Sequence, residues 1–135
     1  MKNDAFSTLV EKALSARESS YSPYSGFAVG AALLCADGSI YTGANIENSS
    51  YTPTVCAERV AFFSAVHDGK REFSAIAIVG GRSGEPVSEF CYPCGVCRQV
   101  MSEFCKGDFK IVLFDGERSR VLTLDELMPC RFVLI

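Results

Sequence analysis

The fold is decided by residues 27–46, which read FAVGAALLCADGSIYTGANI. Residues 27–34 are apolar and typical of a strand, and residues 36–38, Ala-Asp-Gly, have the composition of a hairpin turn. Residues 40–46 follow as the returning strand. The sequence therefore predicts an antiparallel hairpin early in the chain.

Helix and strand patterns alternate around this hairpin. Residues 4–16 place apolar side chains at helical spacing before it. After it come a helix at 56–67, a strand at 74–79, a loop at 80–93, a helix from about Pro93, strands at 109–114 and 121–124, and at most a short helix at 125–128. A hairpin followed by β-α-β-α units predicts a central mixed sheet with helices on its faces.

Composition restricts the class of protein. The chain has 135 residues, of which 48% are hydrophobic and 21% charged, values that exclude a disordered chain. The length fits one ordinary domain over residues 1–135. A net charge of −3 argues against a nucleic-acid partner. With no apolar run of about 18 residues, no membrane association and a cytoplasmic location are expected.

The seven cysteines are expected to be thiols and not disulfides. A reducing compartment disfavours disulfides, and the odd count leaves at least one thiol unpaired. Cys35, Cys105 and Cys130 are expected to be packing residues, because free cysteine behaves as a small hydrophobe.

Chemistry-bearing residues gather at two predicted helix starts, TVCAER at 54–59 and PCGVCRQ at 93–99. Three thiols there, Cys56, Cys94 and Cys97, can bind Zn²⁺ and leave its fourth position for water, as in catalytic zinc sites. The positive potential of a helix start favours thiolates. Three thiolates weaken zinc as a Lewis acid, and Arg59 is placed to offset this by donating hydrogen bonds to the sulfurs.

Glu58 lies two residues after Cys56 and can take a proton from water and deliver it elsewhere. The combination is close to the general signature of zinc-dependent nucleobase deaminases, including its three-cysteine variant.

Two other readings of the cysteines stay open at this point. A lone C-x-x-C pair also occurs in redox motifs and structural zinc knuckles. Cys91 forms a second such pair with Cys94, so that Cys56, Cys91, Cys94 and Cys97 could make a closed four-sulfur site. Such a site would be structural, because no position remains for water.

Nearly the whole chain, from about Tyr21 to Phe132, resembles the cytidine deaminase family in its short, tetrameric form. The resemblance is carried by GFAVGAAL at 26–33, NIEN at 45–48, CAER at 56–59 and PCGVCRQ at 93–99. It implies an α/β fold, a three-layer α-β-α sandwich around a mixed sheet of roughly five strands. It also implies a hydrolase of pyrimidine salvage that deaminates cytidine and deoxycytidine, releasing ammonia, as a homotetramer with one Zn²⁺ per subunit.

The resemblance also implies individual roles. Cys56, Cys94 and Cys97 would bind zinc, Glu58 would shuttle protons, and Arg59 would hydrogen-bond the thiolates. Asn45 and Glu47 would hold the sugar hydroxyls, Phe27 would pack against the pyrimidine, and the backbone of Ala57 would meet the base edge. Ser49, Tyr51 and Phe132 would come from neighbouring subunits. Cys91 and the short apolar tail at 133–135 depart from the family pattern.

Three rival functions accompany this interpretation. A blasticidin S deaminase is similar but lacks the asparagine at position 45 and the arginine at position 59. A nucleic-acid editor usually has histidine as its first ligand and a basic approach surface, unlike Cys56 and the charge of −3. A non-enzymatic zinc module requires four protein ligands.

Overall fold

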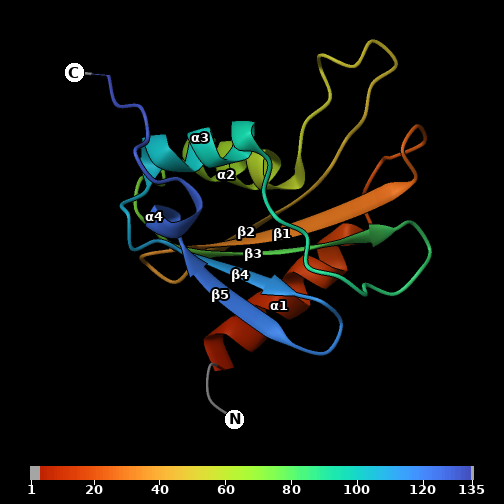
Figure 1. The fold of residues 1–135 in the computed structure, drawn as a ribbon, viewed down its shortest axis with the longest axis horizontal. Helices are drawn as coiled ribbons and strands as arrows, with labels where there is room; N and C mark the ends of the chain where they lie inside the picture. The colour runs from red at the N-terminus through yellow and green to blue at the C-terminus, as the bar shows by residue number, and fades with distance from the viewer. Residues whose placement is uncertain (1–3, 135) are drawn as a thin grey trace.

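The structure, a computed structural model, describes residues 4–134 as a sheet flanked by helices (Figure 1). The strands are β1 Phe27–Cys35, β2 Ile40–Ala44, β3 Phe73–Arg82, β4 Lys110–Phe114 and β5 Ser119–Thr123. The helices are α1 Asp4–Arg17, α2 Ala57–His67, α3 Gly95–Phe104 and α4 Leu124–Leu127. Over residues 4–134, no helix is long and apolar enough to cross a membrane.

Helices cover both faces of the sheet, which confirms the predicted three layers (Figure 1). Successive residues of β3 point to opposite faces, as in any strand. Ile76 and Ile78 belong to the core beneath α2 and α3, where Phe62 is fully buried. Ala77 and Val79 belong to the core beneath α1. One apolar strand therefore supplies both cores, which accounts for its lack of polar alternation.

The five strands pair in the order β2-β1-β3-β4-β5, and the mixed sheet predicted from the sequence is confirmed. β1 is antiparallel to both β2 and β3, β4 is antiparallel to β5, and β3 is parallel to β4. A parallel pair needs a crossover connection. Here that connection contains α3 and the cysteines that precede it, which brings them over the same face as α2.

Two predicted boundaries were wrong near the site, and β5 also begins two residues before the strand predicted at 121–124. β3 continues through Gly80 to Arg82, where a loop was expected, because these residues pair with the first residues of β1. β2 ends at Ala44, and Ile46 forms isolated bridges with Tyr21 and Val55 instead. These bridges place the segment after β2 beside the loop that leads into β1.

Gly43 lets α2 approach the sheet closely. A Cβ atom added at Gly43 would lie 2.4 Å from the carbonyl oxygen of Ala57 and 2.7 Å from the amide nitrogen of Ala61. Both atoms belong to the backbone, so neither can rotate away. The glycine in β2 thus fixes the height of the first turn of α2 above the sheet.

We predict that Gly43→Ala lowers the free energy of unfolding by about 3 kcal/mol, since overpacking against backbone is poorly relieved. Urea denaturation at fixed protein and zinc concentrations measures the change. Gly95→Ala is the matched control, because a Cβ there meets nothing within 4 Å. Equal stability of the two variants would contradict the close approach.

Candidate active site

Two helix starts carry the cysteines. Cys56 and Cys94 occupy the N-cap positions of α2 and α3, and Cys97 lies in the first turn of α3. Neither N-cap side chain accepts a capping hydrogen bond from the backbone of its own helix, so both sulfurs are available to another partner. The free N–H groups at each helix start favour negative charge on these sulfurs.

The three sulfurs form one cluster. The Sγ atoms of Cys56, Cys94 and Cys97 all lie within 4.8 Å of one another. The Cys56 and Cys94 sulfurs are 3.6 Å apart. Two sulfurs bound about 2.3 Å from a tetrahedral zinc ion lie about 3.8 Å from each other. The donor set and its spacing therefore fit a zinc ion held by three thiolates.

Cys91 lies apart from this cluster. Its sulfur rests against Gly80, where an added Cβ would be only 2.7 Å away. Burial raises the pKa of the Cys91 thiol to about 12. Over residues 4–134, the thiol cluster has three members, an arrangement that favours an open zinc site over the closed four-sulfur alternative.

The remaining cysteines differ from one another. Cys35 is buried in the core beneath α2 and α3, and the half-buried Cys105 packs against the same core. Cys130 is exposed, so the prediction of a packing role was wrong for this residue. It follows α4 in a surface turn with a φ of 56°, outside the layers that bury apolar side chains.

Arg59 reaches the thiol cluster from the first turn of α2. Its Nη2 donates a hydrogen bond to the Cys56 sulfur at 3.5 Å. Hydrogen bonding from Cys97, joined by that from Arg59, lowers the pKa of the Cys56 thiol to about 5. The pKa of Cys97 is raised, because its thiol donates toward Cys56. The buried Arg59 Nε has no acceptor among the described residues, so one N–H of this guanidinium makes no hydrogen bond to them.

Glu58 is a buried acid beside the thiols, with 4% of its surface exposed. It lies in the first turn of α2, where the backbone rests on Gly43. Burial raises the pKa of its carboxyl to about 7, and the negative charge of Cys56 acts in the same direction. A carboxyl with a pKa near neutrality can both accept and donate a proton during a reaction.

A cavity of about 310 Å³ opens beside the thiols and Glu58. Its walls include six further side chains, those of Phe27, Val29, Asn45, Glu47, Cys91 and Tyr92, and the residue Ala57. The size suits a small organic molecule. This cavity is lined by every residue for which a role within one subunit was predicted, except Cys97 and Arg59, which join the site through the thiol cluster.

The side chain of Asn45 hydrogen-bonds the backbone at the start of β1, as the backbone of a neighbouring strand would. Its Oδ1 accepts hydrogen bonds from the Val29 amide at 2.9 Å and the Ser20 hydroxyl at 2.5 Å. Its Nδ2 donates to the Phe27 carbonyl at 2.9 Å. These bonds fix the orientation of the amide, and one N–H of Nδ2 has no acceptor among residues 4–134.

The three residues predicted to act from neighbouring subunits are all exposed and do not line this cavity. Tyr51 is 75% exposed and has a φ of 66°, in the loop between β2 and α2. Phe132 is 68% exposed on the segment after α4 and lies beside α3 residues such as Gln99. Ser49 lies in the same loop as Tyr51.

Sequence reasoning missed the anchors of the cysteine-bearing loop. Arg98 Nε donates to the Pro93 carbonyl at 2.8 Å, and its Nη1 donates to the Leu127 carbonyl at 2.7 Å. Arg120 donates to the hydroxyl of Tyr92 and lies over its ring. The position of Arg98 directly after Cys97 is a visible signal, but its backbone partners lie far apart in the sequence.

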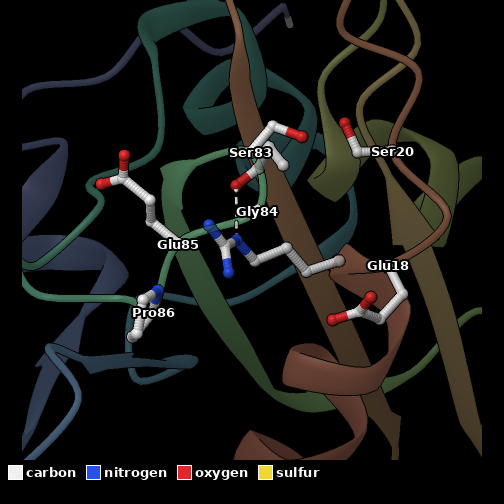
Figure 2. Close-up of a pocket in the computed structure, with 8 residues that line it drawn as sticks. Glu18, Ser20, Ser83, Gly84, Glu85 and Pro86 are labelled. Carbon is white, nitrogen blue, oxygen red and sulfur yellow. Dashed lines mark hydrogen bonds between the residues drawn. The ribbon is translucent and has the colours of Figure 1, made fainter.

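A larger cavity, of about 400 Å³, lies between the end of α1 and residues 83–86 (Figure 2). Its lining includes no cysteine or histidine. Arg17 commits its guanidinium to the backbone carbonyls of Ala28 and Arg82. Size alone therefore does not mark a reactive site here, and the smaller cavity is the one with metal-binding thiols and a buried carboxyl at its wall.

Comparisons with known proteins also indicate a zinc-binding site in this chain. The family profile "Cytidine and deoxycytidylate deaminase zinc-binding region" matches residues 4–113. A cytidine deaminase of Sporosarcina psychrophila is 56% identical, over 92% of this chain and 88% of its own. The crystal structure of a cytidine deaminase from Burkholderia pseudomallei is 44% identical, with a TM-score of 0.85 over 98% of this chain and 100% of its own. A blasticidin-S deaminase of Bacillus cereus is 32% identical, over 77% of this chain and 76% of its own.

We predict that purified protein contains one zinc ion per chain and that Cys97→Ser loses most of it, because two thiolates hold zinc far less tightly than three. Cys91→Ser is the matched control and keeps its zinc, since Cys91 lies outside the cluster. Atomic emission after exhaustive dialysis measures both. Zinc loss in the control would show that Cys91 is a ligand.

Proposed function

The chain belongs to the cytidine and deoxycytidylate deaminase family, and we propose that it hydrolyses cytidine and deoxycytidine to uridine and deoxyuridine with release of ammonia. The observation that carries the proposal is the arrangement of three clustered sulfurs and one buried carboxyl at a single cavity. The first supplies a metal site and the second supplies a proton carrier. Hydrolytic deamination needs a bound metal ion and a proton carrier beside the same carbon atom of the substrate.

Zinc held by Cys56, Cys94 and Cys97 supplies Lewis-acid chemistry that makes water nucleophilic near neutral pH. Glu58 takes a proton from the attacking water and places it on N3 of the cytosine ring. Oxygen adds to C4 as this happens, giving a tetrahedral carbon. Glu58 then takes the remaining proton of the added hydroxyl and passes it to the amino group, and the C4–N bond breaks to release ammonia as C4 becomes a carbonyl. Its pKa of about 7 suits both accepting and releasing that proton.

We assign some residues of the cavity wall to the base of the nucleoside and others to its sugar. Phe27 packs against the pyrimidine, and the backbone of Ala57 meets the base edge. The remaining N–H of Asn45 Nδ2 and the carboxylate of Glu47 present one donor and one acceptor to the sugar. A hydroxyl group both donates and accepts, so this pair suits a sugar hydroxyl. The pair therefore favours a nucleoside as substrate.

Neighbouring copies of the chain complete the site in a homotetramer. Tyr51 and Phe132 support this, because large aromatic side chains so far exposed are typical of residues covered by a partner. Ser49 and Tyr51 reach the sugar end of a neighbour's cavity, and Phe132 closes another. The free thiols of the site require a reducing compartment, which supports a cytoplasmic enzyme of pyrimidine salvage.

We predict that Glu58→Gln keeps its zinc and loses at least about a thousandfold in kcat, because an amide cannot carry the proton. Ultraviolet absorbance during incubation with cytidine measures the rate. X-ray absorption at the zinc edge gives the ligand count, with three sulfurs and one lighter atom expected. Near-normal turnover by the variant would remove Glu58 from the reaction, and four sulfurs would indicate a structural zinc module.

We predict that Tyr51→Ala loses most activity and regains part of it when co-assembled with Glu58→Gln. In mixed tetramers, the variant with intact Glu58 receives Tyr51 from its neighbour, which restores complete sites. The matched control is co-assembly with the double variant Glu58→Gln/Tyr51→Ala, which can restore none. Failure of the first mixture to regain activity would place Tyr51 outside the neighbour's site.

A further inference from the structure

The loop that precedes β1 is hydrogen-bonded to Glu47 through three donors. Glu47 Oε1 accepts from the backbone amides of Tyr24 at 3.0 Å and Ser25 at 3.1 Å. Glu47 Oε2 accepts from the hydroxyl of Ser25 at 2.5 Å. Ser25 is the one residue of this loop that contacts both carboxylate oxygens. Two of the three bonds therefore depend on where Ser25 sits.

The Ser25 hydroxyl also contacts the backbone of Phe27. The position of Phe27 is held independently by the Asn45 bond to its carbonyl and by pairing with Arg82. The Ser25 oxygen accepts a hydrogen bond from the Phe27 amide at 3.0 Å while its proton goes to Glu47. Ser25 itself lines the cavity together with both residues. A single hydroxyl thus joins the residue assigned to the base with a residue assigned to the sugar.

The Glu47 carboxylate keeps one free acceptor position for a ligand. An ionised carboxylate offers about four acceptor positions, two on each oxygen. Tyr24 and Ser25 fill both positions on Oε1, and the Ser25 hydroxyl fills one on Oε2. The Ser25 hydrogen bond also lowers the pKa of Glu47, which keeps the carboxylate ionised and purely an acceptor. One acceptor position is left, on Oε2, and its direction is set by the bond to Ser25.

We infer that Ser25 is a positioning residue, which orients Glu47 Oε2 to accept a hydrogen bond from a sugar hydroxyl of the substrate. The inference rests on the proposed function and assigns no contact between Ser25 and the reacting atoms. Removing the hydroxyl frees the carboxylate to rotate, so the sugar hydroxyl loses a prearranged acceptor. The effect falls on substrate binding, because Glu58 and the thiols have no contact with Ser25 among the described hydrogen bonds.

A substrate comparison isolates this role. Wild type, Ser25→Ala and Ser25→Thr are assayed with cytidine and with 2′,3′-dideoxycytidine, which lacks the 2′ and 3′ hydroxyls of the sugar. We expect Ser25→Ala to raise KM for cytidine about tenfold, the effect of losing one hydrogen bond to a charged group at a partly exposed site. Its kcat stays within about threefold, and its KM for the dideoxy substrate stays within about twofold of wild type. Ser25→Thr retains the hydroxyl and recovers most of the loss.

Ser22→Ala is the matched control in the same loop. The Ser22 side chain contacts neither Glu47 nor Phe27 among the described hydrogen bonds, so its KM for cytidine stays at the wild-type value. An equal KM increase for both substrates in Ser25→Ala would overturn the inference and leave Ser25 a structural residue. An unchanged KM for cytidine would also overturn it. Wild-type protein that deaminates neither substrate would overturn the proposed function itself.

Discussion

Three sulfur atoms from two helix starts have to lie within 4.8 Å of one another, and much of the rest of the structure serves that requirement. Thiolates repel one another, so their approach depends on rigid backbone and on nearby positive groups. Gly43 brings the start of α2 down onto the sheet, and Arg98 ties the loop before α3 to the segment at Leu127. Arg59 and the two helix dipoles supply the compensating charge.

The site beside the three sulfurs also requires Glu58 to be buried. A carboxyl that is 4% exposed is unfavourable for stability, because its charged form loses solvation. The same loss of solvation brings its pKa to about 7 and makes it useful as a proton carrier. Burial of Glu58 thus lowers the stability of the fold and makes this carboxyl reactive. The tight apolar packing of the two cores on either side of β3 can sustain such a site.

Much of this architecture could be predicted from local patterns. The apolar run at 74–79, the hairpin at 27–46 and the two cysteine motifs are local signals, and they correctly indicated the mixed sheet and the helix starts. Gly80 and Gly81 misled the prediction because glycine usually ends a strand, whereas here the small residues let neighbouring side chains pack closely. The roles of Ser25 and Arg98 could not be predicted, because they depend on partners more than twenty residues away. The exposure of Cys130 follows from the course of the chain after α4, which has no periodic signal.

The contact between Gly80 and Cys91 limits how the substrate range of this protein can be redesigned. An added Cβ at position 80 would lie 2.7 Å from the Cys91 sulfur and 3.0 Å from the Phe27 ring. That part of the cavity wall cannot be narrowed from β3 without displacing the aromatic ring. The other partner in this contact, Cys91, lies on a loop, so its side chain can be shortened without moving β3. Directed evolution toward bulkier bases therefore has a tractable starting point at residue 91.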